Sequence, residues 1–531
     1  MLMYVVEEEQ KEKQRQGKSE CNKGENNSGD LKLPTRKFLL TLPLTVKKPF
    51  YNSNFGLWKK FCPYMEETKT SGNTHRFKSV YLFLISFVVA LGITLLIKEP
   101  GFSDSQIYVI FLLFFSIGLW ATEAIPAFAV SLFIISFLVF ALGNKYFNSA
   151  PEDVSHYVHT FSDSIIWLLL GGFFLAKAMA KTKLDEALFK FTLQIAGTNP
   201  RNLLIGIMST TMLASMLLSN TATTTMVLAA LMPLLKTLDK NSGVAKALLL
   251  GIPLAATTGG MATIVGTPAN AIAVGMLQNE GITVEFVDWM IYGVPVAIIV
   301  NAVCCFALIK VYIKDTTPIS TAFLNDLEID TSKEAKLQRN IVIGVILVTI
   351  GLWITSSFHG VKAAAVCAVP LVVLTVTGVL SGKDVQTLGW DTLLLVAGGL
   401  SLGLALNHTG ILNHYAEILM TLQLNSILLL SIFAFLAMIL ANVMTNSTAT
   451  TLMVPICMAI LPTMKLEVAL IVALSSSSAL MLLASSPSNS IVFNTGFLQQ
   501  KDFKLNGIIY GLLGPLFAIL WVLFVTLIIT N

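Results

Sequence analysis

Long apolar runs recur through this 531-residue chain from Val80 to its C-terminus. Many of these runs reach about 18 residues, the length at which an apolar stretch becomes a candidate for a helix that crosses the hydrocarbon core of a bilayer. Only 12% of the residues are charged, whereas about a quarter are charged in a typical soluble domain. The sequence therefore predicts an all-α polytopic membrane protein, with about 11 transmembrane helices.

Two stretches of small polar residues interrupt this apolar pattern. Residues 219–227 read Ser-Asn-Thr-Ala-Thr-Thr-Thr-Met-Val, and residues 445–455 read Thr-Asn-Ser-Thr-Ala-Thr-Thr-Leu-Met-Val-Pro. Such a run at membrane depth is costly unless it lines a cavity or binds something. Because one copy lies in each half of the chain, the pair predicts a transporter with its site between two inverted-topology repeats.

Further segments recur in the same order. Each polar stretch is followed by a turn that contains Pro and Asn, at residues 266–270 and 485–489. Each is preceded by an apolar segment with a glycine pair, Gly171-Gly172 or Gly398-Gly399, after which Lys181-Thr182 aligns with His408-Thr409. We interpret the glycine-pair segments as two kinked re-entrant hairpins and the polar stretches as breaks in helices.

The first 78 residues differ from the rest. They contain 15 Lys or Arg and 9 Asp or Glu, which gives a surplus of +6 directly before the first apolar run. The positive-inside rule predicts that this largely disordered tail is cytosolic, and its scattered charges do not favour a nucleic-acid partner. The predicted order is tail (1–78), first helix and first repeat (79–313), polar linker (314–339) and second repeat (340–531).

The broken helices indicate what the site binds. A free helix N-terminus carries unpaired N–H groups and partial positive charge, so it favours an anion, while unwound carbonyls suit a hard cation such as Na⁺. No Lys or Arg lies in either polar stretch or in the Pro-containing turns. A dianion there must therefore be neutralised by helix ends and bound cations. This favours a divalent organic anion that is co-transported with Na⁺. We expect no organic cofactor.

With these motifs, residues 80–531 resemble the divalent anion/sodium symporter (DASS) family of the ion transporter superfamily. The resemblance rests on the motifs above together with Trp120-Ala-Thr-Glu-Ala-Ile-Pro126 and Trp167-Leu-Leu-Leu-Gly-Gly172. It implies a homodimer of 11-helix protomers in the lipid bilayer. Each protomer would have a scaffold domain and an elevator-type transport domain for C4-dicarboxylates, citrate or sulfate. The plasma membrane is the expected location.

The resemblance also implies site residues. The anion would contact Asn220, Thr221, Thr267, Pro268, Asn446, Ser447, Ser486 and Pro487. The first Na⁺ would use Ser215, Ser219, Asn220 and the Gly266 carbonyl. The second would use Asn446 and the carbonyls of Met444 and Ser485, and it is the weaker site because Ala441 stands where a hydroxyl is expected.

Other functions stay open at this point. A sulfate/Na⁺ symporter, a Na⁺-independent anion exchanger and an anion channel are compatible with the same fold, and a membrane scaffold would show no uptake. An enzyme is disfavoured, although Gly399-Leu-Ser401-Leu-Gly403 matches a hydrolase pattern that needs a strand–turn–helix context. His156 and His159 lie near acidic residues, but scattered histidines in a polar loop are a poor metal site.

Overall fold

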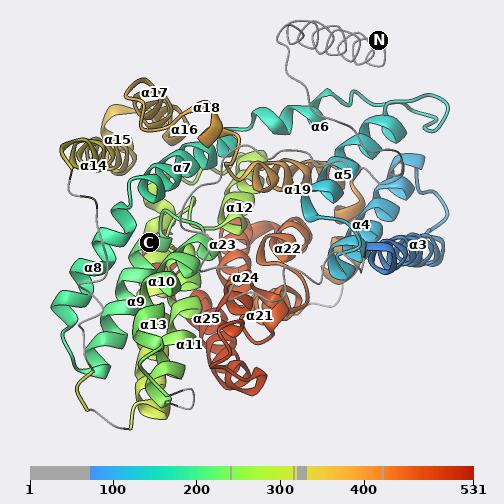
Figure 1. Cartoon of the computed structure of the whole chain (residues 1–531). Helices are drawn as coiled ribbons and strands as arrows, with labels where there is room; N and C mark the ends of the chain where they lie inside the picture. The colour runs from blue at the N-terminus through green and yellow to red at the C-terminus, as the bar shows by residue number, and fades with distance from the viewer. Residues whose placement is uncertain are drawn as a thin grey trace, which may run out of the picture. The chain divides into compact units, whose positions relative to one another are not determined.

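A computed structural model describes residues 72–239, 242–314, 317–319, 330, 332–420 and 424–530. All regular structure in these ranges is helical, as the sequence predicts (Figure 1). Residues 1–71 of the predicted tail and residues 320–329 of the predicted linker lie outside the described residues.

The first half of the described chain contains eleven α-helices and one short 3-10 helix. They are α3 (Gly72–Ile97), α4 (Asp104–Thr122), α5 (Ala127–Leu142), α6 (Ser155–His159), η3 (Thr160–Ser162), α7 (Ser164–Lys181), α8 (Leu184–Ala196), α9 (Pro200–Ser215), α10 (Asn220–Leu235), α11 (Gly243–Met261), α12 (Pro268–Asn279) and α13 (Phe286–Tyr312).

The second half continues in the same way. Its helices are α14 (Lys333–Ile354), α15 (Ser356–His359), α16 (Ala363–Val366), α17 (Ala368–Val376), α18 (Gly382–Val385), α19 (Trp390–His408), α20 (Ile411–Met420), α21 (Ser426–Val443), α22 (Asn446–Ile460), η5 (Pro462–Met464), α23 (Lys465–Ser476), η6 (Leu483–Ser485), α24 (Pro487–Phe493) and α25 (Gln500–Thr530).

Nine helical segments of the described chain are long and apolar enough to cross a membrane, or ten if one bent pair counts as a span. The sequence-based estimate of about 11 is close to this number. Two helices begin several residues before the boundaries predicted for the tail and the linker. Helix α3 begins at Gly72, inside the predicted tail, and α14 begins at Lys333, inside the predicted linker, where the Ser332 hydroxyl caps it by accepting from the Ala335 N–H.

The glycine pairs do not kink their helices. Helices α7 and α19 run unbroken through Gly171-Gly172 and Gly398-Gly399. A methyl group built at Gly171 would collide with Cys367, and one built at Gly398 would collide with Ser131. The glycines therefore let neighbouring helices approach closely, as small residues do at helix interfaces in membranes. The predicted kinks are wrong for this reason.

We expect Gly398→Val to destabilise the protein, because α19 packs along α5 and the added side chain has no room beside Ser131. Overpacking of this kind costs about 1–3 kcal/mol. The matched control is Gly344→Val on α14, where a built Cβ meets nothing within 4 Å. Thermal unfolding in detergent measures the difference; equal midpoints for the two variants would contradict the packing role.

Helices of the first half of the chain pack against helices of the second half. Helix α12 lies against α22 and α23, α10 contacts α24, and α13 lies along α25. Elements that flank the two polar stretches are thereby brought together, which is what positions the candidate site.

Candidate binding site between two helical hairpins

The first polar stretch lies at a turn between two helices. Helix α9 ends at Ser215 and α10 begins at Asn220. Ser219 is the N-cap of α10, and its hydroxyl accepts a hydrogen bond of 3.3 Å from the Ala222 N–H. The Ser215 hydroxyl donates to the Asn220 side-chain oxygen at 2.9 Å. A serine cap of this kind ends the preceding segment and starts a new helix with its N–H groups free.

The direction of α9 follows from its contacts with α11. Gly251 of α11 packs against Leu204 and Met208, and Gly259, two turns later, packs against Met212 and Ser215. Helices α9 and α11 therefore run in the same direction, and the Ser215 end of α9 lies beside the C-terminal end of α11.

Helix α10 must then turn back toward the start of α11. It begins beside Gly260, and only seven residues, 236–242, connect its end to Gly243. Such a connection spans at most about 25 Å, whereas a straight continuation would leave the ends about 50 Å apart at 1.5 Å per helical residue. Helices α9 and α10 therefore form a hairpin with Ser219 at its tip.

The second polar stretch has the same arrangement. Helix α21 ends at Val443 and α22 begins at Asn446, with the Thr445 hydroxyl accepting from the Thr448 N–H at 3.3 Å. The Asn442 side-chain oxygen accepts from the Met481 N–H at 2.9 Å, which places the end of α21 beside the end of α23. Helix α22 in turn meets the segment 462–476 at a bend of 116°.

Both polar stretches therefore lie at the tips of helical hairpins, α9–α10 and α21–α22. The prediction that the glycine-pair segments are the hairpins is wrong, and so is the prediction that the polar stretches only break a helix. The mistake has a physical cause: at the level of composition, a short polar break is the same whether the chain continues straight or turns back.

The Pro-containing turns are the true breaks within helical segments. Thr267 and Ser486 have nearly the same extended backbone, with φ/ψ of −148°/144° and −146°/133°. The amide of Asn270 donates to the carbonyls of Gly260 and Thr263, and that of Asn489 donates to those of Leu480 and Leu482. One asparagine thus satisfies the unwound carbonyls of each turn.

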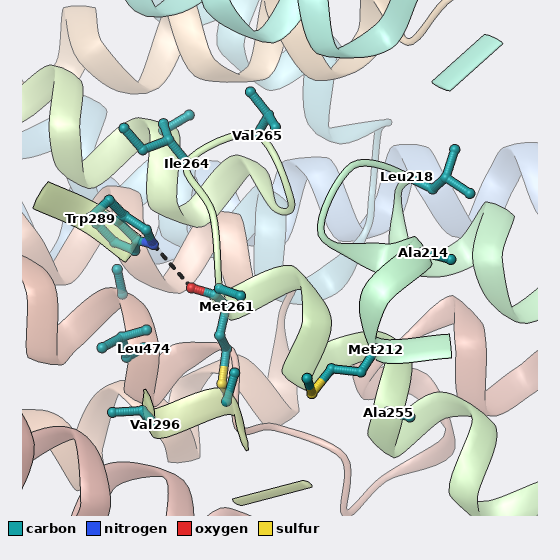
Figure 2. Close-up of a cluster of buried hydrophobic side chains, with 14 of the residues drawn as sticks. Met212, Ala214, Leu218, Ala255, Met261, Ile264, Val265, Trp289, Val296 and Leu474 are labelled. Carbon is teal, nitrogen blue, oxygen red and sulfur yellow. Dashed lines mark hydrogen bonds between the residues drawn. The ribbon is translucent and has the colours of Figure 1, made fainter. Parts of the chain in front are cut away.

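The first turn has an additional support from the surrounding core. Figure 2 shows the indole of Trp289 pointing at the Met261 carbonyl, where α11 ends, and the two are joined by a hydrogen bond of 3.0 Å. Met261, Ile264 and Trp289 are almost completely buried. The unwound backbone is therefore held in a fixed shape by apolar packing and by hydrogen bonds to its carbonyls.

The two hairpin tips and the two Pro-containing turns line one cavity of about 1070 Å³. All eight residues expected to contact the anion line it: Asn220, Thr221, Thr267, Pro268, Asn446, Ser447, Ser486 and Pro487. Of the residues expected to bind cations, Ser219, Gly266 and Ser485 also line it, whereas Ser215 and Met444 lie behind its wall and are buried.

Four helices begin at this cavity: α10, α12, α22 and α24. The first two begin at Asn220 and Pro268, and the others at Asn446 and Pro487, so all four helix N-termini face a shared space. The two prolines have no N–H group, so at α12 and α24 only the following residues can supply one. Unpaired N–H groups and the partial positive charge of helix N-termini favour an anion there. The remaining wall comes mainly from α7, the start of α8, the segment between α18 and α19, and the start of α19.

Oxygen atoms gather behind the first tip. A methyl group built at Gly260 would lie 2.6 Å from the Asn220 side-chain oxygen and 3.2 Å from the Gly266 carbonyl oxygen. The Ser215 hydroxyl is 2.9 Å from the same Asn220 oxygen. Side-chain and backbone oxygens packed this closely are the ligand set that a hard cation prefers, and the absence of a Cβ at Gly260 leaves room for them.

The second tip lacks this arrangement. Aligning the hairpins places Ala441 at the position of Ser215, and aligning the turns places Ala479 at the position of Gly260. Both alanines are completely buried. The hydroxyl is therefore missing, and a methyl group stands where the first half leaves space. The second tip therefore offers one hydroxyl fewer and less space at this position than the first.

The cavity wall also carries charged side chains that the predicted site does not include. Lys177 lines the cavity from α7, although the predicted site contains no lysine. Its position on the wall follows from helical periodicity, because Phe173, Ala176 and Ala180 of α7 line the cavity as well. That periodicity was visible in the sequence, but the cavity that selects this face of α7 was not.

The hydrolase-like serine has a structural role. Ser401 lies in the middle of the continuous helix α19, where its hydroxyl donates to the carbonyls of Tyr157 and Ala397 at 2.8 and 2.9 Å. A strand–turn–helix context does not surround it. The histidines at 156 and 159 belong to no cluster of three or more metal-ligating side chains among the described residues.

Comparison with known proteins decides the family. A family model described as a citrate transporter matches residues 117–477, which is more than half of the chain. The chain belongs to the citrate transporter family. The match spans the first hairpin tip, both glycine pairs and the second tip, and it confirms the resemblance to the divalent anion/sodium symporters.

Individual relatives of this citrate transporter family member are also transporters. It is 26% identical over 477 residues to the sodium-dependent dicarboxylate transporter SdcS of Staphylococcus saprophyticus, covering 81% of this chain and 88% of that protein. It is 30% identical over 356 residues to the inorganic phosphate transporter PHO87 of Saccharomyces cerevisiae, covering 64% of this chain but 37% of the yeast protein. The chain thus spans less than half of its yeast relative.

Among solved structures, the chain is similar to MtrF of Neisseria gonorrhoeae, which is described as illuminating a class of antimetabolite efflux pumps. The TM-score is 0.49 at 13% sequence identity, and the alignment covers 76% of this chain and 96% of that one.

Proposed function

We propose that this protein is a secondary active transporter that moves a divalent organic anion, of the C4-dicarboxylate or citrate class, together with Na⁺. The observation that carries the proposal is the single cavity onto which both hairpin tips open, lined by all eight anion-contact candidates. A dicarboxylate has one carboxylate for the N-terminus of α10 and one for that of α22. The relatives named as sodium-dependent dicarboxylate transporters support this substrate class.

The charge balance at the hairpin tips supports cation coupling. The tips supply amide and hydroxyl groups but no guanidinium or ammonium group. Helix N-termini carry only partial charges of roughly half a unit each, so bound Na⁺ would complete the neutralisation of a dianion. We place the principal Na⁺ at Ser215, Ser219, Asn220 and Gly266. We place a second, weaker Na⁺ at Met444, Asn446 and Ser485. It is weaker because Ala441 offers no hydroxyl ligand and the methyl group of Ala479 occupies space that is free in the first half.

Transport then requires that the cavity be exposed alternately to the two sides of the membrane. We infer that the hairpins and Pro-containing turns move together as an elevator-type transport domain, in a homodimer at the plasma membrane with a cytosolic N-terminus. The close packing of α12 against α22 and α23, and of α10 against α24, supports a body that carries both tips as one unit.

The test is uptake by purified protein in liposomes with labelled succinate, citrate, sulfate and phosphate, each with a gradient of Na⁺ or of K⁺. We expect Na⁺-dependent accumulation of succinate or citrate above the external concentration. Accumulation of phosphate or sulfate alone would mean that the transported substrate is an inorganic dianion. Exchange without Na⁺, or flux that never exceeds the external concentration, would contradict the symport mechanism.

A further inference from the structure

Lys177 is a cationic side chain on the wall of the cavity that holds the candidate site. It is partly buried on α7, on the helix face formed by Phe173, Ala176 and Ala180. This wall is separate from the hairpin tips, so the lysine belongs to none of the motifs that define the anion and cation sites.

The neighbouring lysines form ion pairs, whereas Lys177 has no such partner among the described residues. Lys181, one turn further along α7, forms an ion pair of 2.7 Å with Asp384, and Lys183 forms one of 3.4 Å with Glu186. Within the described part of the chain, Lys177 makes no ion pair. An ammonium group without a carboxylate partner, facing a water-accessible cavity, is available to an anion.

The acidic residues of the cavity compete weakly for this charge. Three of them line it: Asp185, Glu186 and Asp391. Glu186 is paired with Lys183, and Asp391 lies in the first turn of α19, where the helix N-terminus favours its charge. Burial raises the pKa of the Asp185 carboxyl, so its ionised form is less favoured than that of an exposed carboxyl.

We propose that Lys177 attracts the divalent anion into the cavity and sets the preference for divalent over monovalent anions, while the hairpin tips hold the anion at the binding position. This inference rests on the proposed function. A fixed charge on the wall of a cavity that is enclosed by low-dielectric protein raises the local concentration of an oppositely charged solute, and the effect grows with the charge of that solute. Salt weakens it at the cavity mouth.

The experiment compares four proteins in the liposome uptake assay with labelled succinate. They are the wild type, Lys177→Gln, Lys177→Arg and the control Lys181→Gln, which removes a paired lysine one turn away. We expect Lys177→Gln to raise KM for the dianion about tenfold and to leave the maximal rate largely unchanged. Lys177→Arg restores the wild-type KM, and Lys181→Gln stays close to it.

A chemical rescue separates charge from packing. Lys177→Cys treated with an aminoethyl methanethiosulfonate reagent regains a primary amine at position 177, and we expect its KM to return toward the wild-type value. A sulfonatoethyl reagent, which adds a negative charge, raises KM further. Treated wild-type protein controls for its own cysteines, of which Cys304, Cys305, Cys367 and Cys457 are buried.

The outcomes distinguish this inference from the proposed function. Wild-type uptake with an unchanged KM in Lys177→Gln would overturn the role of Lys177 and leave the function intact. So would a loss of maximal rate that neither Lys177→Arg nor the aminoethyl reagent reverses. Absence of wild-type uptake for every dicarboxylate tested would refute the proposed function and this inference with it.

Discussion

Uptake of the transported dianion is expected to fall at least about 100-fold when Asn220 is replaced with alanine, while the protein still folds. Asn220 is the first residue of α10, lines the cavity and accepts a hydrogen bond from Ser215. We assign it contacts with both the anion and the principal Na⁺. Loss of two charge-assisted contacts of about 1.5–3 kcal/mol each corresponds to roughly 10²- to 10⁴-fold. Initial uptake rates in liposomes measure it.

The control for this substitution is Asn425→Ala. Asn425 also caps a helix, accepting from the Ile427 N–H at 2.9 Å, but it lies at the other end of α21. We expect this variant to lose about 1 kcal/mol of stability and to keep its transport. Asn446→Ala, at the second tip, is expected to abolish uptake as Asn220→Ala does. Unimpaired transport by both tip variants would refute the site assignment.

Gly260→Ala is expected to weaken Na⁺ binding at the proposed principal cation site. The added methyl group would lie 2.6 Å from the Asn220 side-chain oxygen and 3.2 Å from the Gly266 carbonyl oxygen, so the amide must move away. Loss of one ligand to a charged group costs about 1.5–3 kcal/mol. The Na⁺ concentration for half-maximal uptake should therefore rise at least about tenfold, as measured by uptake at a series of Na⁺ concentrations.

The chain contains its own control for Gly260→Ala. Ala479 is the corresponding residue in the second half, and it is completely buried. Ala479→Gly removes a methyl group instead of adding one, so we expect no increase in the Na⁺ concentration needed. An equal rise in the half-maximal Na⁺ concentration of both variants would show that either substitution merely perturbs the fold. An unchanged half-maximal Na⁺ concentration in Gly260→Ala would contradict the placement of the cation at this position.

The candidate site residues could be predicted from the sequence because polar side chains are unusual in an apolar segment. A run such as Ser219-Asn220-Thr221 has no reason to lie in an apolar segment unless it contacts something polar, and its second copy made chance implausible. The asymmetry at Ala441 was visible for the same reason, since a missing hydroxyl changes the residue type. The structure adds Ala479, which has no meaning until the position of Gly260 beside Asn220 is known.

The path of the chain through these segments was harder to predict from the sequence. The glycine pairs Gly171-Gly172 and Gly398-Gly399 predict kinks, but a glycine pair has the same sequence whether it bends a helix or lets a neighbour approach. Only the positions of Cys367 and Ser131 decide between these. Likewise, the return of α10 toward α11 depends on the contacts of Gly251 and Gly259 and on a short connection, which local propensity does not encode.

Matching helix ends in the two halves were better predicted. Alignment on the glycine pairs places Thr182 on Thr409, and both threonines cap their helices by donating to the carbonyl four residues earlier, Ala178 or Ala405, at 2.8 Å. Each is followed by a left-handed residue, Lys183 or Gly410. Repeats are easiest to recognise where a cap demands a particular side chain.

The most direct measurement of the central claim is a cryo-EM map of the purified protein in Na⁺ with citrate or succinate, whichever it transports. The account predicts anion density in the cavity, in contact with Asn220 and Asn446 from the two hairpin tips at once. Density bound away from both tips, or tips too far apart to contact one dicarboxylate, would contradict it.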